Sequence, residues 1–322
     1  MNAIPYLDVN QLKEKLPWLA LIKAIDAIFT SDVIEPLRHQ HDINVPNEPT
    51  ASILLKPAWI EGEYLGVKQV AIFPGNNTRG LPGLNSSYLL SSAKTGEPLL
   101  QLDADELTAR RTAAASALAS RYLSRIDSSK LLMIGSGRLA KSLVEAHQIV
   151  RPISEIQVWS RNQSSAQKIV DELISEGKKA VVCSDENLPQ QINAADIISC
   201  ATMSTQPIVL GQYLNEGTHL DLVGAFTPKM RETDDETIQK SSVFVDTRAG
   251  ALSEAGDLTQ AMQSGVFTSS QVVAELSELS AKLHAGRSQL SHSESQITLF
   301  KSVGAGREDL AAAILAYQAL AL

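Results

Sequence analysis

Two groups of residues in this 322-residue chain have types and spacing that could do chemistry. The first is the run GSGRLA at residues 135–140, which fits the pattern G-x-G-x-x-A between a predicted strand and a predicted helix. In such a loop the first glycine permits a tight turn, and the second lets the backbone approach a pyrophosphate. The helix start adds free N–H groups and a partial positive charge. We therefore predict a dinucleotide-binding loop, whose pyrophosphate contacts are Gly135, Gly137, Arg138 and Leu139.

The end of the next predicted strand indicates which dinucleotide this loop would take. An acid there would accept hydrogen bonds from the ribose hydroxyls and favour NAD, but residues 159–162 read WSRN. Ser160 can donate to a 2′-phosphate, and Arg161 can pair with it. The sequence thus favours NADPH, with NADH as the alternative cofactor. A solvent-exposed arginine without such a role is the other interpretation of Arg161.

The second group consists of basic residues in places where a charge is costly. Lys68 lies in the apolar run VKQVAIF, where a buried lysine needs an anionic partner. Arg110 and Arg111 are adjacent in a predicted helix, about 100° apart, so that only one of them can face inward. Two guanidinium groups and an ammonium group that converge would hold a carboxylate in a fixed orientation. An edge-strand lysine and exposed arginines are the alternative interpretation.

The elements that must position these residues are of two kinds. Residues 1 to about 30 predict a short strand or turn and then a helix, and residues 52–103 predict strands joined by hairpins. An Ala-rich stretch from residue 103 predicts a long helix, after which short apolar strands alternate with helices. This alternation predicts a parallel sheet covered on both faces, and hence an α/β fold.

Composition and charge restrict the class of protein. An apolar fraction of 44% and a charged fraction of 20% exclude a mainly disordered chain, and the net charge of −8 argues against a general nucleic-acid binder. Two cysteines, Cys183 and Cys200, exclude a disulfide framework and predict buried free thiols. We see no signal peptide, membrane span or metal-ligand spacing, so we expect a cytoplasmic protein without a nucleic-acid or membrane partner.

Four stretches together resemble the ornithine cyclodeaminase/mu-crystallin family. They are GVKQVAIFPGNN at 66–77, ELTARRTAAASALA at 106–119, IGSGRLA at 134–140 and TLFKSVGAGREDL at 298–310. The resemblance implies a Rossmann-type doubly wound parallel sheet inserted into a smaller α+β domain that binds substrate and forms a homodimer. The expected boundaries are residues 1–118 plus 296–322 for the substrate and dimerisation domain, and 119–295 for the dinucleotide-binding domain.

The resemblance also implies roles for single residues. The family pattern selects Arg111 of the arginine pair and places it with Arg38 and Lys68 around a substrate carboxylate, with Val303 beside the substrate. The positions that match the family's dinucleotide contacts are Arg111, Thr202, Val223 and Ser302.

Lys68 is the expected catalytic residue. Burial beside arginines would lower its pKa, so that it could pass a proton to or from a substrate nitrogen near neutral pH. His39 and His41 flank Arg38 and are alternative acids, although histidines in a polar stretch are also typical of an exposed loop.

One position departs from the family's cyclodeaminases, which carry an aspartate in the segment VGxD. Residues 223–226 read VGAF here, so Phe226 stands where that acid would be. A phenyl ring cannot take a proton or pair with an ammonium group, which argues against cyclodeamination of ornithine. An apolar wall at this position suits the ring of a cyclic imino acid.

Together these residues predict an NAD(P)H-dependent oxidoreductase that acts on a C=N bond. The expected reaction takes Δ1-pyrroline-2-carboxylate to L-proline, within proline metabolism, and the analogous one takes Δ1-piperideine-2-carboxylate to L-pipecolate. The alternatives are a non-catalytic NADPH-binding protein like the mu-crystallins, an ornithine cyclodeaminase or an alanine dehydrogenase.

Overall fold

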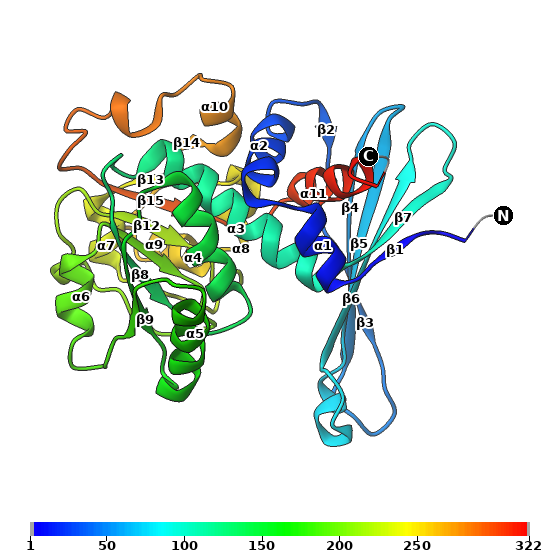
Figure 1. The fold of residues 1–322 in the computed structure, drawn as a ribbon, viewed down its shortest axis with the longest axis horizontal. Helices are drawn as coiled ribbons and strands as arrows, with labels where there is room; N and C mark the ends of the chain where they lie inside the picture. Colours follow the sequence, from blue (N-terminus) through cyan, green and yellow to red (C-terminus); the bar gives the residue numbers. More distant parts are fainter. Residues whose placement is uncertain (1–2, 321–322) are drawn as a thin grey trace. The chain divides into compact units, whose positions relative to one another are not determined.

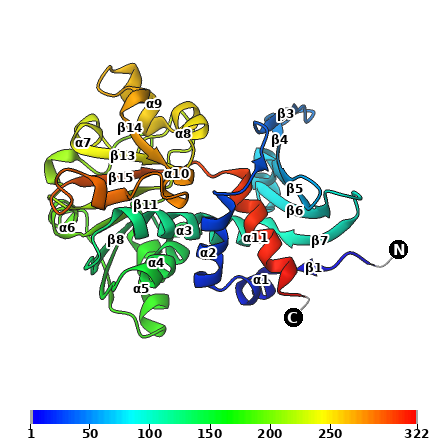
Figure 2. The same cartoon turned by 90° about the horizontal axis from the view of Figure 1, so that it is seen from above.

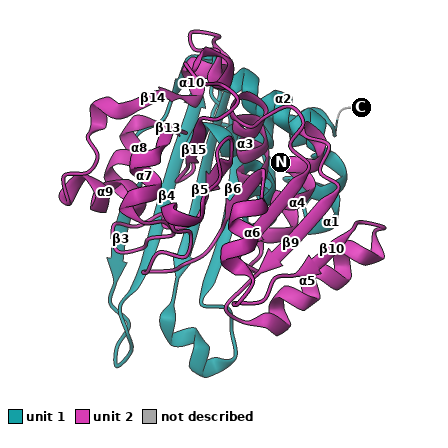
Figure 3. Ribbon diagram, turned by 90° about the vertical axis from the view of Figure 1, so that its left-hand side faces the viewer, with its two compact units in different colours: residues 1–111, 306–322 teal, residues 112–305 magenta. Residues whose placement is uncertain are grey.

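The computed structural model describes residues 3–320, and the chain divides into two compact units (Figure 3). Unit 1 consists of the described residues up to Arg111 together with those from Gly306 onward, and unit 2 consists of residues 112–305. The first boundary falls within helix α3 (Ala104–Leu123).

These boundaries differ from those expected from the sequence, which lay at 118/119 and 295/296. The difference matters most for strand β15 (Ile297–Lys301), which the sequence boundaries assigned to the first domain. The strand pairs with β12 and β13 in the sheet of unit 2, because a completely buried apolar strand is stable only between two neighbours that satisfy its backbone.

Unit 1 is built on an antiparallel sheet in the order β1-β7-β6-β5-β4-β2, with β3 also paired to β4 and β1 parallel to β7. Its strands are β1 (Tyr6–Leu7), β2 (Val33–Ile34), β3 (His39–Ile43), β4 (Ala51–Ile60), β5 (Tyr64–Ile72), β6 (Leu84–Ser92) and β7 (Pro98–Asp103). A 3₁₀ helix, Pro74–Arg79, lies in the loop predicted between β5 and β6.

Helix α11 (Gly306–Gln318) packs against β4 to β7 and against α2 (Trp18–Ile28). The single helix predicted near the start is wrong, because α1 (Val9–Lys15) ends before α2 begins. Pro17 stands between them, and its missing N–H group interrupts the helical hydrogen bonds.

Unit 2 has an eight-stranded parallel sheet in the order β10-β9-β8-β11-β12-β15-β13-β14 (Figure 1). Its strands are β8 (Lys130–Ile134), β9 (Glu155–Trp159), β10 (Ala180–Val182), β11 (Ile197–Cys200), β12 (His219–Leu222), β13 (Ser241–Val245), β14 (Val272–Glu275) and β15. Its remaining helices are α4 (Leu139–Val150), α5 (Gln163–Ser175), α6 (Leu188–Ala194), α7 (Asp235–Lys240), α8 (Arg248–Glu254), α9 (Gly256–Gln263) and α10 (Leu276–Ser280). Short 3₁₀ helices occur at Gly211–Tyr213, Ser269–Gln271 and Gly286–Gln289.

The helices of unit 2 cover both faces of its sheet. Figure 2 shows α4 and α5 on one side and α7, α8 and α9 on the other. From β8 the chain proceeds outward through β9 and β10, and then returns to β11 and β12 on the other side of β8. In sheets of this kind a ligand site forms where the order reverses, at the carboxyl ends of the strands.

The predicted free thiols, Cys183 and Cys200, are both buried in unit 2. Across residues 3–320 no helix combines the length and apolar character needed to cross a bilayer. The same described residues contain no group of three or more His, Cys, Asp or Glu side chains that could hold a metal ion.

Candidate active site

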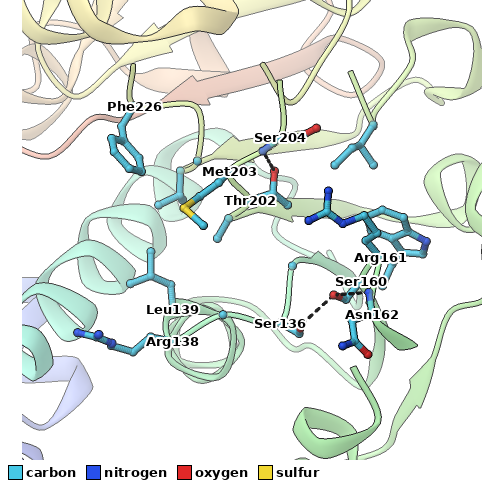
Figure 4. A pocket seen from close by; sticks show the side chains of 17 residues that line it. Ser136, Arg138, Leu139, Ser160, Arg161, Asn162, Thr202, Met203, Ser204 and Phe226 are labelled. Carbon is cyan, nitrogen blue, oxygen red and sulfur yellow. Dashed lines mark hydrogen bonds between the residues drawn. The ribbon is translucent and has the colours of Figure 1, made fainter. Parts of the chain in front are cut away.

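A pocket of about 640 Å³ lies in unit 2 at the carboxyl ends of β8, β9, β11 and β12 (Figure 4). Its wall is formed by the loops that follow these four strands, so it stands at the point where the strand order reverses. Eight of the residues predicted to contact a dinucleotide line it, and they are Gly135, Gly137, Arg138, Leu139, Ser160, Arg161, Thr202 and Val223.

The glycine loop after β8 has the backbone that its pattern requires. Gly135 has a φ of +118°, and a Cβ there would lie 2.6 Å from the carbonyl oxygen of Ala201. No other heavy atom lies within 4 Å of the position that a Cβ on Gly137 would take. Both observations describe a main chain held close to the sheet on one side and open to a ligand on the other.

Helix α4 begins in this loop without a side-chain cap, because Arg138 at the N-cap position makes no capping hydrogen bond. The N–H group of Ala140 is bonded to the carbonyl of Gly137, at 3.1 Å. Uncapped N–H groups and the helix dipole favour an anion. The loop and helix start therefore fit the pyrophosphate of a dinucleotide.

The segment after β9 forms the polar end of the pocket. Ser160 accepts a hydrogen bond from the Ser136 hydroxyl, at 2.8 Å, and Arg161 is exposed. Asn162 caps α5 by accepting from the N–H groups of residues 164 and 165, at 3.1 and 3.4 Å. No acid stands among the described residues of the pocket wall, so nothing there opposes a phosphate beside Arg161.

The side of the pocket away from Arg161 carries apolar side chains and one arginine. Figure 4 shows Phe226, Leu139 and Met203 on this side, with Arg138 below Leu139. Phe226 is 41% exposed and lines the pocket, so it is accessible to a ligand there.

A cluster of charged side chains lies inside unit 1, between β5 and α11. Lys68 forms an ion pair with Asp309, with Nζ 2.8 Å from Oδ2. Arg111 donates to Asp309 at 2.8 Å and to Glu308 at 2.6 Å. All four side chains are buried. The anionic partner that a lysine in this strand requires is thus an acid of the chain itself.

Two further cations belong to this cluster. Lys56 stands directly opposite Lys68 across β4 and β5, and the charges of Arg38 and Arg111 help to lower its pKa, after the larger effect of burial. Lys56 therefore lies within reach of the charges of two arginines and of two acids, Glu308 and Asp309.

Burial is the main reason why the pKa of Lys68 is lowered to about 7. The charges of Arg111 and Lys56 lower it further, while Asp309 acts in the opposite direction. Burial alone would raise the pKa of Asp309, but Arg111 and the two lysines hold it below its usual value. At neutral pH the Asp309 carboxyl is thus ionised, and Lys68 exchanges a proton readily.

Three predicted site residues have other surroundings. Arg111 belongs to the cluster of unit 1, whereas Ser302 and Val303 belong to unit 2 but do not line its pocket. Ser302 is buried and donates its N–H to Leu222, and Val303 donates its N–H to Asp246 at 2.8 Å. The roles predicted for these residues remain predictions.

The expectation that only one of Arg110 and Arg111 faces inward is wrong, because both side chains are buried. Arg110 donates to the carbonyl of Leu16 and lies 4.1 Å from the ring centre of Trp18, whereas Arg111 joins the acidic pair. Sequence reasoning missed Lys56, Glu308 and Asp309. The acids were signalled by their place in the first turn of a helix, where acids are common for other reasons, and by their place in the fourth stretch that resembles the family.

Comparison with known proteins agrees with this architecture. The model of the ornithine cyclodeaminase/mu-crystallin family matches residues 8–321. An uncharacterized protein of Schizosaccharomyces pombe is 50% identical over 97% of this chain and 96% of its own length. The Δ1-pyrroline-2-carboxylate reductase of Paracoccus denitrificans is 37% identical over 87% of this chain and 89% of its own length.

Solved structures show the same fold. The Δ1-pyrroline-2-carboxylate reductase of Thermococcus litoralis, in complex with NADH and L-proline, has a TM-score of 0.89 and 34% identity, covering 99% of this chain and 98% of that one. An archaeal alanine dehydrogenase dimer with bound NAD has a TM-score of 0.87 and 28% identity, covering 99% and 96%. The matches confirm the expected α/β fold and the expectation of an oxidoreductase. The chain belongs to the ornithine cyclodeaminase/mu-crystallin family.

Proposed function

We propose that this chain reduces a cyclic imino acid with a nicotinamide dinucleotide, taking Δ1-pyrroline-2-carboxylate to L-proline. Δ1-Piperideine-2-carboxylate, which gives L-pipecolate, is the second substrate. The observation that carries the proposal is Phe226, an accessible apolar side chain in the pocket wall. Relatives named for the pyrroline reaction, and a neighbour solved with L-proline, support the same substrate class.

Phe226 selects among the reactions of the family through what it cannot do. Cyclodeamination of a diamino acid needs an acid that pairs with the substrate's amino groups, and Phe226 stands where the family's cyclodeaminases carry that aspartate. A cyclic imine has no ammonium group to pair, and its ring is largely apolar. A phenyl ring is therefore a favourable neighbour for the imine and an unfavourable one for ornithine.

The cluster of unit 1 would hold the substrate carboxylate. Arg38, Lys68 and Arg111 are the basic groups that would pair with this carboxylate, with Lys56 opposite Lys68 in the sheet. A carboxylate fixed in this way has its ring oriented as well, which lowers the entropic part of the barrier. Lys68 would carry the proton that the ring nitrogen needs, because its pKa of about 7 allows both protonation states near neutral pH.

The glycine loop, the start of α4 and the segment after β9 would hold the dinucleotide. When bound, the reduced nicotinamide supplies a hydride to the imine carbon, while the ring nitrogen keeps its proton and becomes the amine. Thr202, Val223 and Phe226 would form the wall beside the reacting ring and limit the access of water.

NADPH is the proposed preferred form, because Ser160 and Arg161 stand where an acid would otherwise contact the ribose. Arg161→Ala should weaken the binding of NADPH by about 1.5–3 kcal/mol, which is the contribution of a charge-assisted contact. The binding of NADH should change little. Equal losses for the two cofactors would reject the role of Arg161.

The test of the whole proposal is the loss of absorbance of reduced nicotinamide when the protein is mixed with NADPH and Δ1-pyrroline-2-carboxylate. L-Proline should appear in the same amount as the NADPH consumed. Tight binding of NADPH without turnover would instead favour a binding protein like the mu-crystallins, and rapid release of ammonia from ornithine would favour a cyclodeaminase.

A further inference from the structure

Three ionisable side chains lie behind the wall of the unit 2 pocket, and we call Glu232, Asp257 and Lys301 the buried ion cluster. Each has no exposed surface. They come from separate segments, since Glu232 precedes α7, Asp257 lies on α9 and Lys301 ends β15. None of them has a role in the reaction proposed above.

The buried ion cluster is bonded directly to the pocket wall. The Oε1 atom of Glu232 accepts from the N–H and the hydroxyl of Thr202, at 2.7 and 2.8 Å. The ammonium group of Lys301 donates to the carbonyl of Gly224 and lies 3.1 Å from Asp257. Thr202 and Gly224 both line the pocket, so one layer of residues separates the cluster from a ligand.

Glycine at position 224 makes this close approach possible. A Cβ there would overlap with the Glu232 carboxylate and with the carbonyl oxygen of Thr202. Asp257 holds Glu232 from the other side by accepting the N–H groups of residues 232 and 233, at 2.8 and 3.0 Å. The loops after β11 and β12 are therefore linked through a single carboxylate.

The cluster has two carboxylates and one cation, so it carries a negative charge when fully ionised. Burial is the main cause that raises the pKa of Glu232 to about 7, Asp257 adds to it, and Lys301 opposes it. Cys200 of β11 is also close, but burial raises the pKa of its thiol well above the usual value, so it stays neutral. One oxygen of Glu232, Oε2, has no hydrogen-bond partner in the described chain.

The position of this charge relative to a dinucleotide follows from the strand order. The pyrophosphate belongs at the loop after β8, and the adenosine half on the side of β9. The nicotinamide half then extends toward the ends of β11 and β12, where Thr202 and Gly224 stand. The oxidised nicotinamide ring is positively charged and the reduced ring is neutral, so a buried negative charge there acts on only one of them.

We propose that Glu232 is a positioning residue for the dinucleotide, which fixes Thr202 in the wall and whose charge makes the pocket favour the oxidised cofactor over the reduced one. The proposal rests on the proposed function only in that the pocket takes a nicotinamide dinucleotide. Tighter binding of the oxidised form makes hydride transfer from the bound reduced cofactor more favourable, and thus assists reduction of the substrate.

The test measures binding of each cofactor in the absence of substrate, by titration calorimetry at pH 8. Glu232→Gln keeps the shape and the acceptor oxygen but removes the charge. The affinity for NADP⁺ should fall on the order of tenfold, the effect of one charge across a short stretch of protein interior, while that for NADPH changes less than about twofold. The matched control is Glu236→Gln on α7, a half-exposed carboxylate paired with Lys240, which should change neither affinity.

The native protein provides a second test that needs no variant. Its preference for NADP⁺ over NADPH should increase from pH 6 to pH 8, because Glu232 loses its proton in this range. Taking the ratio of the two affinities cancels titration of the cofactor's own phosphates. Thr202→Val removes the hydrogen bond from the Thr202 hydroxyl to Glu232 but leaves the charge of Glu232 in place. This variant should lower the affinities for NADP⁺ and NADPH by similar factors, and the ratio of the two affinities should still change with pH.

An equal loss of both affinities in Glu232→Gln would show a merely structural role and overturn the proposal. The proposal would also be overturned if the ratio of the affinities for NADP⁺ and NADPH in the native protein did not change with pH. This measurement can be made even if the variant fails to fold. If neither dinucleotide binds the native protein, the proposed function itself has failed, which is a different result from an unchanged ratio.

Discussion

Two opposing effects set the pKa of Lys68. Burial and the neighbouring cations lower the pKa of the ammonium group, and Asp309, 2.8 Å away, keeps it from falling further. An acid works best when its pKa lies close to the pH of the reaction. The same lysine on an exposed strand would stay protonated and give up its proton too slowly to assist the chemistry.

Reduction should slow as the pH rises through about 7, because Lys68 then loses the proton that it donates. Lys68→Met should remove this step from the pH profile and lower kcat/KM by roughly 10²–10⁴-fold, the usual contribution of an acid–base group. Steady-state rates of NADPH oxidation between pH 5.5 and 9 measure both effects. His39→Gln and His41→Gln, on the exposed strand β3, serve as controls that leave the rate nearly unchanged, and a larger loss in either of them would transfer the role to histidine.

Phe226→Asp should depress imine reduction by roughly tenfold or more, because it places an unpaired charge against an apolar ring. Phe226→Asn is the matched control, since it loses the same packing without adding the charge. We expect the native protein to release no ammonia from ornithine. If the aspartate variant reduces the imine as fast as the asparagine variant, the apolar wall does not select the substrate.

The sheet of unit 1 has a close contact that depends on a glycine in a strand. Gly66 of β5 lies beside the ring of buried Tyr88 on β6, and a Cβ on the glycine would overlap with the tyrosine hydroxyl. Gly66→Ala should lower the free energy of unfolding by about 1–3 kcal/mol through overpacking, measured by chemical denaturation. Tyr88→Phe in the same chain should recover part of the loss, and a single variant as stable as the native protein would contradict this account.

Elements with a local cause were predictable from the sequence. The glycine loop and the long α3 follow from short-range patterns that tertiary contacts reinforce. The place of β15 between β12 and β13 could not be predicted from the sequence, because a buried parallel strand has the same apolar pattern at any position in the sheet. The break at Pro17 was readable, but the continuing apolar spacing concealed it.

The charged cluster was predictable only in part, for a reason of distance along the chain. The apolar neighbours of Lys68 predict that its ammonium group has an anionic partner. That partner, Asp309, is 241 residues away in the sequence, so the pairing could not be predicted locally. Lys56 lies in an equally apolar run, and its relation to Lys68 becomes visible only once the β4–β5 register is known. Pairings of this kind are properties of the fold rather than of any local segment.

At the scale of the whole molecule, we predict a homodimer. The sheet face of unit 1 opposite α11 carries an apolar row, Pro57, Val67 and Leu89, and Leu89 is 38% exposed. A related alanine dehydrogenase of the same fold is a dimer. Sedimentation velocity at micromolar concentration should give about twice 34.7 kDa, and Leu89→Glu should shift the protein toward the monomer. A native protein that sediments as a 34.7 kDa species would refute the prediction.

The interrupted path of unit 1 has a consequence for synthesis on the ribosome. Arg111 and its acidic partner Asp309 are 198 residues apart, so about 10–40 s separate their translation at ordinary rates of 5–20 residues per second. Unit 2 is one continuous segment and can fold during that interval, whereas β4 to β7 have no α11 to cover them. The nascent chain thus exposes an apolar sheet with unneutralised lysines and arginines until its last helix emerges, and this is the stage at which a chaperone would matter most.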